Sequence, residues 1–421
     1  METLEAYLQR EAVDLTSKCT TCGKCVEVCP IVAHTSVASA EPKAVVTRVV
    51  DYLRGGPLSE AAATWVDRCT GSGECITACP EHINPRKMLS IAVSRLRGER
   101  TGLGTNPNAE FFRRMSQTIH LLVGTQMEPE RFRAVTGHDG DTRQGDVVFY
   151  LGCNVLRTPH IIFTVLDLLD LLEVDYRVLG GVSNCCGIIH LKFKGDVAGA
   201  GAVTGNTIDK IAAFRPQTAL HWCPSCVLHL GETTAGFRPI EFEWSHVTRF
   251  LADRLDALRP RMQPVRVRAA FHKHDGGLDV AANVRTLLAA IPGLELVEIE
   301  DRATWSYTCG PLGLNLAPEL KAAVHRELLD AAKAAGVDVL VDLYHSCHRD
   351  LCGFESEYPF RIVNWTTVLA ESLGLPYHED RFKRYRLMND IKAVLEDAKD
   401  FIAANRLDPR MVEEMLPNLL N

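Results

Sequence analysis

Five cysteines between residues 153 and 226 constrain this chain more than any other feature of its sequence. Cys153 ends the strand-like run FYLGC, Cys185 and Cys186 are adjacent in SNCCG, and Cys223 and Cys226 form a CPSC motif. Adjacent cysteines pair poorly with each other, so thiols that converge from three loops are best explained by a soft, multivalent group such as an iron–sulfur cluster. The alternative is a set of unrelated core cysteines, which are common in proteins. Such cysteines have no reason to fall into CC and CxxC motifs at loop positions.

A second cysteine motif, CTTCGKCVEVCP, lies near the N-terminus and contains Cys19, Cys22, Cys25 and Cys29. This is the CxxCxxCxxxCP run of bacterial ferredoxins, and a zinc site would need neither its fourth cysteine nor its proline. In folds with two clusters the fourth cysteine belongs to the other cluster. The first run therefore predicts a second cysteine run in the same region.

The second run is CTGSGECITACP, in which Ser72 stands where the second cysteine would be. Crossed ligation predicts a complete [4Fe-4S] set and an incomplete second set. The first set is Cys19, Cys22, Cys25 and Cys79, and the second is Cys29, Cys69 and Cys75. Three thiolates suit a [3Fe-4S] cluster, or a [4Fe-4S] cluster whose fourth iron takes Ser72, water or no further ligand.

Charge and hydropathy exclude several other classes of protein. The net charge of −7 and the isoelectric point near 6.1 argue against nucleic acid or anionic lipid as the main partner. The N-terminus shows no signal peptide, and no apolar run reaches the roughly 18 residues of a membrane span. We expect a cytoplasmic metalloprotein that contacts a membrane, if at all, through a partner at the inner membrane.

The sequence pattern predicts five segments. Residues 1–100 form a helical arm with two clusters, and residues 101–145 form a polar connector with one packing helix and no site. Residues 146–262 and 263–380 alternate strands and helices, which predicts parallel α/β sheets. Their motifs recur at an offset of about 122 residues, typical of a duplicated domain. Residues 381–421 form a helical extension for packing or subunit docking, and the glycine-rich stretch 199–205 is expected to be a helix rather than a dinucleotide loop.

The second repeat has lost most of the cysteine set. Asp275 stands opposite Cys153, Thr308 opposite Cys185, and Tyr344 opposite Cys223. A second metal, either zinc or a [2Fe-2S] cluster of mixed ligation, would have to use the remaining donors. The candidate ligands are Cys309, Cys347, Cys352, His274 and Asp275, and His272, His345 and His348 could gather at the same pocket. Because no regular four-ligand spacing is present, the pattern favours a relic or a partner-docking role.

A ferredoxin arm followed by two such repeats resembles the CCG-domain iron–sulfur proteins, over residues 15–375. These include the C and B subunits of heterodisulfide reductase, here fused, and the iron–sulfur subunits of glycolate oxidase and anaerobic glycerol-3-phosphate dehydrogenase. The resemblance implies an α-helical two-cluster ferredoxin domain followed by a duplicated α/β CCG (cysteine-rich) domain. It also implies that the first CCG domain binds a noncubane [4Fe-4S] cluster. The implied ligands are Cys153, Cys185, Cys186, Cys223 and Cys226.

The arm carries a further resemblance, over residues 15–100. Its second run, with the following Ile83-Asn84-Pro85, is similar to the iron–sulfur subunit of succinate dehydrogenase and fumarate reductase. In that family the same spacing holds a [3Fe-4S] cluster. The resemblance thus favours three irons at Cys29, Cys69 and Cys75.

Clusters in series imply electron flow. We therefore expect an electron-transfer subunit of a multisubunit heterodisulfide reductase-like oxidoreductase, which relays electrons from the ferredoxin-type clusters to the noncubane cluster. No flavin or nicotinamide fingerprint is present, so the expected partner is a flavoprotein or a heterodisulfide reductase A-like subunit. The alternative is a catalytic thiol–disulfide reductase with Cys185 and Cys186 as candidate reactive residues. Whether the chain is itself an enzyme stays open.

Overall fold

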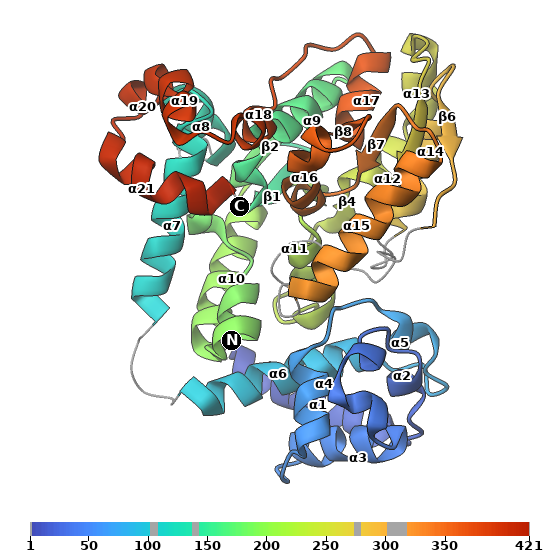
Figure 1. Ribbon diagram of the computed structural model, residues 1–421. Coiled ribbons are helices and arrows are strands. Elements are labelled where there is room, and N and C mark those ends of the chain that lie inside the picture. The colour runs from blue at the N-terminus through green and yellow to red at the C-terminus, as the bar shows by residue number, and fades with distance from the viewer. Residues whose placement is uncertain (1, 102–107, 137–142, 273–278, 301–317, 421) are drawn as a thin grey trace.

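The computed structural model describes residues 2–101, 108–136, 143–272, 279–300 and 318–420. A helical N-terminal region, blue in Figure 1, lies below two parallel sheets, and the C-terminal helices, red, lie beside a helix of the connector. The expected order of a helical arm followed by two α/β units is therefore confirmed. None of the helices within the described ranges is long and apolar enough to cross a membrane.

The N-terminal region is built from amphipathic helices around one apolar cluster. In α3, for example, Val45, Val46, Val49 and Val50 recur with helical period and are buried. The helices are α1 (Leu4–Lys18), α2 (Lys24–Glu27), α3 (Pro42–Leu53), α4 (Glu60–Asp67), α5 (Glu74–Thr77) and α6 (Pro85–Thr101). This arrangement confirms the prediction of a helical arm.

The two cysteine runs of the arm adopt the same local structure. Gly23 precedes α2 with φ of 90°, and Gly73 precedes α5 with φ of 87°. Both glycines are in the left-handed region, where a side chain would be strained. Each run therefore turns sharply after its second position, Cys22 in the first and Ser72 in the second.

The first α/β unit contains a four-stranded parallel sheet in the order β2-β1-β3-β4. All six residues of β1 are buried, as expected for a central parallel strand covered by helices. The strands are β1 (Val147–Gly152), β2 (Tyr176–Gly180), β3 (Thr218–His221) and β4 (Glu243–His246). The helices are α9 (Pro159–Leu171), α10 (Val197–Ala213), α11 (Pro224–Leu228), α12 (Val247–Ala252) and α13 (Leu255–Leu258), with short turns at Val155–Arg157, Val182–Asn184, Ile189–Phe193, His229–Thr233 and Arg259–Arg261.

The second unit repeats this topology, with a parallel sheet in the order β6-β5-β7-β8. Its strands are β5 (Arg268–Phe271), β6 (Glu295–Val297), β7 (Val339–Asp342) and β8 (Arg361–Asn364). Its helices are α14 (Val280–Ala289), α15 (Pro318–Ala334), α16 (His345–Leu351) and α17 (Trp365–Ser372), with a 3₁₀ turn at Cys352–Ser356. The identical strand order confirms the internal duplication.

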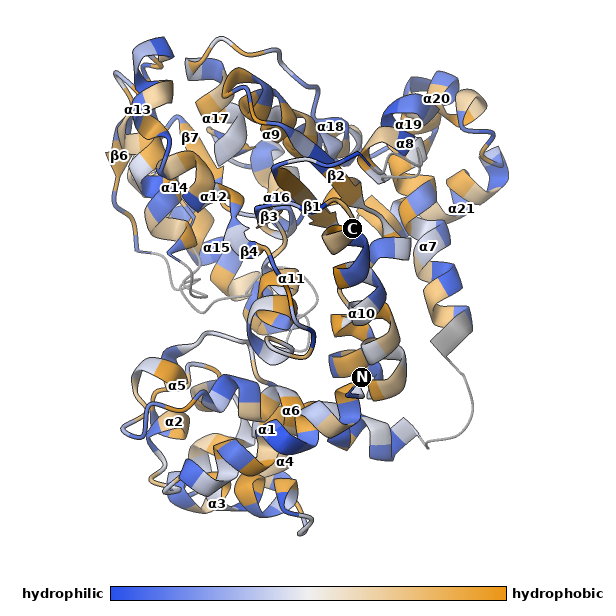
Figure 2. Cartoon of the chain, turned by 180° about the vertical axis from the view of Figure 1, so that it is seen from behind, coloured by the Kyte–Doolittle hydropathy of each residue, from blue (hydrophilic) through white to orange (hydrophobic). Residues whose placement is uncertain are grey.

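The two units share a single hydrophobic core. Helix α9 packs against α17, and α12 packs against α14. Because α9 is equivalent to α14 and α12 to α17, the internal repeat relates these two contacts to each other. The rings of Trp222 and Trp365 stack at the centre, with centroids 5.8 Å apart. In Figure 2 the strands β1 and β2 are coloured as hydrophobic, whereas the covering helices carry mixed colours. The repeats therefore bury their apolar faces against each other as well as within each sheet.

The connector and the C-terminal segment form a third helical layer. The connector contains α7 (Asn108–Gly124) and α8 (Pro129–Thr136), and the C-terminal segment contains α18 (Arg381–Met388), α19 (Ile391–Asp397), α20 (Lys399–Ala404) and α21 (Pro409–Leu420). Leu121 and Leu122 of α7 pack with Phe382 of α18 in one apolar cluster. The extension thus packs against this chain's own connector.

Candidate functional site

The five cysteines of the first unit lie at the carboxyl ends of its two central strands and in the loop after β2. Cys153 follows β1, Cys223 and Cys226 flank the start of α11 after β3, and Cys185 and Cys186 follow the turn after β2. In open parallel sheets, ligands bind at this edge because the strands end there together. The position of each cysteine loop after its strand therefore brings the three loops to one edge of the sheet.

The five sulfur atoms form a continuous chain of contacts. Cys153 contacts Cys185, Cys185 contacts Cys186, Cys186 contacts Cys226, and Cys226 contacts Cys223. Hydrogen bonds from Cys153 and Cys186 lower the pKa of Cys185 well below its usual value. A hydrogen bond from Cys226 likewise lowers the pKa of Cys223. Five contacting sulfur atoms, two of them with a lowered pKa, are a donor set that suits a soft metal cluster.

A histidine from the second unit contacts this set. His345 begins α16, is buried, and adds to the lowering of the pKa of Cys223 through a hydrogen bond and its charge. Its Nε2 lies 3.4 Å from Nδ2 of Asn154, the residue after Cys153. The second repeat therefore completes the wall around the cysteines of the first.

The Cys185–Cys186 loop is held from behind by α10. The hydroxyl of Thr207 donates to the carbonyl oxygen of Cys185, and that of Thr204 to the carbonyl oxygen of Cys186, both at 2.8 Å. Gly187, at φ of 98°, lies so close to Thr204 that an added Cβ would be 2.5 Å from its hydroxyl. The glycine of the CCG motif is thus required by the close approach of α10. This helix includes the glycine-rich stretch 199–205, so the prediction of a helix there is confirmed.

The cysteines line a cavity of about 400 Å³. Its other walls come from α7, through Phe111, Arg114 and Met115, and from Arg157. The prediction that the connector takes no part in a site is therefore wrong. Burial lowers the pKa of Arg157 to about 9, and its Nε makes no hydrogen bond within the described residues. The cavity thus combines thiols, apolar surface and a buried cation.

The seven cysteines of the arm fall into two neighbouring groups. Burial raises the pKa of Cys25 to about 12, and the nearby Cys19, Cys22 and Cys79 raise it further. Burial also raises the pKa of Cys29 to about 11, with a further contribution from Cys69.

Cys75 belongs with the second of these groups. Burial raises its pKa, and the strongest neighbouring charges are those of Cys69 and Cys29. Ser72 is buried just before Gly73 in the same run. The first neighbours of Cys25, Cys29 and Cys75 fit crossed ligation, although Cys25 of the first group also lies near Cys75. Buried thiols that repel one another as anions fit a cationic iron cluster between them.

The second arm group lies beside the first α/β unit. Phe193 lines both a small pocket next to Cys69 and the large cavity next to Cys185. Buried Arg86 of α6 pairs with Glu232 at 2.5 Å and donates to the carbonyl oxygen of Gly71 at 2.9 Å. This ion pair fixes the second run of the arm against the unit that carries the cavity.

The second-half metal candidates divide between different places. Cys347 packs in the core shared by the two units, whereas Cys352 packs with Phe382 and the C-terminal helices. Cys309, His274 and Asp275 lie outside the described residues. The structure therefore does not bring Cys347 and Cys352 to a common site.

Sequence reasoning missed the residues that support the cysteines. Thr204, Thr207 and Arg157 belong to no motif; the two threonines hold the cysteine loop from α10, and Arg157 lines the cavity. His345 lies in a repeat motif, but the sequence places it among the second-half donors and not beside Cys223. The histidines and cysteines near residue 345 are a signal in this region, but the pattern favours a relic or a partner-docking role over a second metal.

Comparison with known proteins identifies the family. Residues 15–83 match the 4Fe-4S dicluster domain, and residues 147–231 and 272–351 each match the cysteine-rich domain known as CCG. The chain is a CCG-domain iron–sulfur protein. The two CCG matches fall on the two parallel sheets, and the dicluster match covers both cysteine runs of the arm.

Relatives that match this CCG-domain protein over most of its length are components of reductases. It is 24% identical over 381 residues to the B subunit of the fumarate reductase (CoM/CoB) of Methanothermobacter marburgensis, covering 86% of this chain and 72% of that one. It is 24% identical over 396 residues to the D subunit of the dihydromethanophenazine:CoB–CoM heterodisulfide reductase of Methanosarcina mazei. The corresponding subunit of Methanosarcina acetivorans is 23% identical over 394 residues. Each Methanosarcina alignment covers 85% of this chain and 94% of the relative.

Proposed function

We propose that this chain is the iron–sulfur electron-transfer subunit of a multisubunit heterodisulfide reductase-like oxidoreductase. Electrons would pass between the ferredoxin-type arm and the cysteine set of the first CCG domain. A flavoprotein or heterodisulfide reductase A-like subunit would exchange electrons with the arm. The relatives support this proposal, because those from Methanosarcina are named as subunits of heterodisulfide reductases.

The observation that carries the proposal is the position of Phe193. This side chain lines the pocket beside Cys69 and also the cavity beside Cys185. The half-buried Phe193 thus lies beside both the second arm group and the CCG set, which supports a short path between them. Such an arrangement suits electron transfer, which needs short separations and little exchange of water.

The bound clusters would supply one-electron redox chemistry. The residues of the chain would hold the clusters and set their reduction potentials. We assign Cys19, Cys22, Cys25 and Cys79 to a [4Fe-4S] cluster. We assign Cys29, Cys69 and Cys75 to a [3Fe-4S] or open [4Fe-4S] cluster beside Ser72, and the five CCG cysteines to a noncubane [4Fe-4S] cluster. A missing thiolate removes negative charge and raises the reduction potential of the second arm centre. Lys192, which lines the pocket beside Cys69, acts in the same direction.

Rapid-freeze EPR of the anaerobically purified complex tests this assignment. After photoreduction, the signals of the arm should appear first and that of the CCG set later. Cys75→Ala removes a proposed ligand of the arm and should slow the later signal by about tenfold or more. Cys352→Ala, which removes a buried cysteine outside both sites, is the matched control. Equal rates of CCG reduction in wild type and Cys75→Ala would overturn the relay.

The cavity favours a second candidate function, that of a thiol–disulfide reductase acting at the CCG cysteines. Its volume of about 400 Å³ extends from the sulfur atoms to α7 and the buried Arg157, which leaves room for a substrate. Dithionite-reduced protein should then be reoxidised by an added disulfide, with turnover that depends on Cys185 and Cys186. No disulfide-dependent oxidation by either the isolated chain or its complex would remove this candidate.

A further inference from the structure

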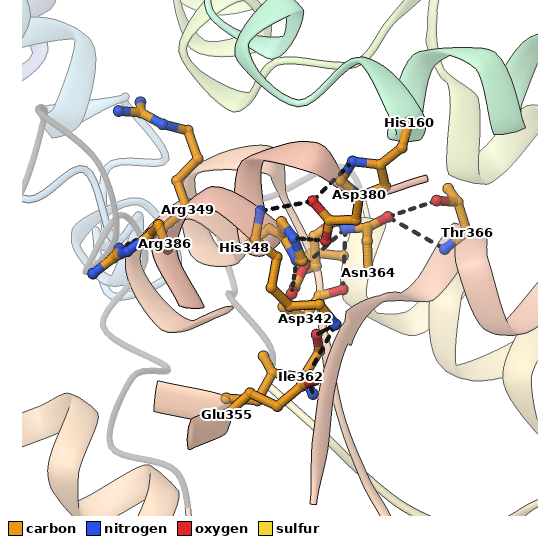
Figure 3. A network of polar contacts seen from close by, with 12 residues as sticks. His160, Asp342, His348, Arg349, Glu355, Ile362, Asn364, Thr366, Asp380 and Arg386 are labelled. Atoms are coloured by element: carbon orange, nitrogen blue, oxygen red, sulfur yellow. Dashed lines mark hydrogen bonds and ion pairs between the residues drawn. The ribbon is translucent and has the colours of Figure 1, made fainter. Parts of the chain in front are cut away.

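Three buried side chains from three distant segments meet between the two CCG domains. His160 lies in the first turn of α9, His348 in α16, and Asp380 caps the N-terminus of α18 (Figure 3). One donor atom of each lies within 4.8 Å of those of the other two. The relative exposure of all three residues is 9% or less. None of them belongs to the cysteine sites described above.

Both oxygen atoms of Asp380 face a histidine. Its Oδ2 lies 2.6 Å from Nε2 of His348, and its Oδ1 lies 3.4 Å from Nδ1 of His160. Two donors bound to the same tetrahedral zinc ion, each about 2 Å from it, are themselves about 3.3 Å apart. The His160–Asp380 distance of 3.4 Å already matches this separation, whereas the 2.6 Å between His348 and Asp380 would have to lengthen.

Hydrogen bonding does not account for the burial of the His160 ring. It is buried, and neither of its ring nitrogens makes a hydrogen bond within the described part of the chain. A buried imidazole normally satisfies at least one nitrogen. Burial lowers the pKa of His160 to about 4, so the ring is neutral and has a lone pair to donate.

His348 has the outer partner that metal-bound histidines use. Its Nδ1 lies 2.8 Å from Oδ2 of Asp342, whose Oδ1 accepts a hydrogen bond from Asn364 at 2.8 Å. Thr366 in turn donates to Asn364 at 2.9 Å through its hydroxyl. A carboxylate on the second nitrogen fixes the tautomer and orientation of a ligating histidine. Asp342 therefore leaves Nε2 of His348 directed at Asp380.

We propose that His160, His348 and Asp380 bind one divalent transition-metal ion, and that this ion is zinc. Two imidazoles and one carboxylate are zinc ligands, and a water or the second carboxylate oxygen completes four-coordination. The charge supports a dication, because Asp342 and Asp380 together bring two negative charges into the interior. Lys383 and Arg386 are further cations near this group, so the dication would share the charge balance with them.

The ion would hold together three segments that the chain sequence places far apart. Helix α9 follows the loop of Cys153, α16 begins at His345, and α18 starts the C-terminal helices. A metal at this junction would therefore fix the second CCG domain against the first and keep His345 at Cys223. Its role is structural, in the half of the molecule that lacks a complete cysteine set.

X-ray absorption at the zinc edge tests the proposal on the anaerobically purified wild-type protein with its iron clusters. We expect about one zinc per chain, with a nitrogen and oxygen shell and the outer scattering of imidazole. A sulfur shell would place the zinc in a cysteine site and overturn the proposal. Absence of zinc after growth in zinc-supplemented medium would also overturn it, and would leave the residues as a buried Asp–His–Asp ion network.

Variants separate this site from the cysteine sites. His160→Gln and Asp380→Asn should each reduce bound zinc at least tenfold, with iron and sulfide per chain unchanged. His378→Gln is the matched control, because it removes the neighbouring histidine–carboxylate pair with Asp167, 2.7 Å apart, without touching the three ligands. Unchanged zinc in both ligand variants would contradict the assignment. If a variant does not fold, the wild-type spectrum still decides.

Discussion

At the scale of single residues, the contact between His345 and Cys223 is the point where the second repeat acts on the chemistry of the first. A hydrogen bond to a thiolate stabilises the more negative state of whatever that thiolate binds. His345 is therefore a positioning and tuning residue, supplied by the domain that has lost its own ligand set. His345 acts on Cys223 electrostatically, and the cysteine motifs alone do not reveal this contact.

We predict that His345→Asn lowers the reduction potential of the CCG centre. Loss of a charge-assisted hydrogen bond worth about 1.4 kcal/mol corresponds to about 60 mV for one electron. Potentiometric titration followed by EPR measures the shift. His325→Asn, a buried histidine of α15 in the same domain, is the control and should leave the potential unchanged. A potential unaffected by His345→Asn would show that the contact does not tune the centre.

Gly152→Ala should prevent assembly of the CCG centre while leaving the arm intact. Gly152 has φ of 68°, and an added Cβ would lie 2.8 Å from Sγ of Cys226. Backbone strain there costs about 1–3 kcal/mol, and the sulfur must move. Iron quantitation and EPR should show loss of the CCG signal alone. Gly231→Ala, where an added Cβ meets nothing within 4 Å, should retain all signals, and retention in Gly152→Ala would refute the steric argument.

At the scale of elements, α6 is the joint between the arm and the first CCG domain. Its buried Arg86 holds both Glu232 and the carbonyl oxygen of Gly71, and Arg97 donates to the carbonyl oxygen of Lys192 at 2.8 Å. One face of one helix thus carries the polar contacts that keep the second cysteine run in place beside Phe193.

Arg86→Met is predicted to loosen the arm. Removing one member of a buried ion pair costs about 3–5 kcal/mol because the other charge is left unpaired. Limited proteolysis between the arm and the CCG domains should accelerate, and electron transfer to the CCG centre should slow. Arg48→Met removes an exposed ion pair with Asp51 and should cost less than about 1 kcal/mol. Equal proteolysis of the two variants would contradict a docking role for Arg86.

At the scale of the whole molecule, the two CCG domains are one folding unit. The stacked Trp222 and Trp365 lie in a core to which both sheets contribute. Trp365→Ala should therefore destabilise both domains together, by about 3–5 kcal/mol. Denaturant unfolding of the CCG region should remain a single transition with a lower midpoint. Tyr377→Ala, at a side chain that is 76% exposed, should change little, and two separate transitions in wild type would contradict the shared core.

The sequence predicts the parts of this architecture that are encoded locally. Cysteine spacing and the strand–helix alternation are short-range patterns, and the offset of about 122 residues is visible as a sequence repeat. The helical arm, the duplicated α/β fold and the grouping of cysteines at strand ends follow from them. The walls of the cavity do not, because α7, Arg157 and His345 reach it from different parts of the chain. The histidine–carboxylate site is hidden for the same reason. Its three residues are spread over 220 positions, from residue 160 to residue 380, and share no spacing.

Helix α10 contacts both the first helix of the arm and the CCG loop. Near its N-terminal end, Gly201 lies against Leu4 of α1, close enough that an added Cβ would be 2.9 Å from that of Leu4. One and two turns later, Thr204 and Thr207 hold the carbonyl oxygens of Cys186 and Cys185. A partner that displaces α1 would therefore move α10, whose Thr204 and Thr207 contact the CCG loop. The spectrum of the CCG centre should therefore change when a partner binds α1.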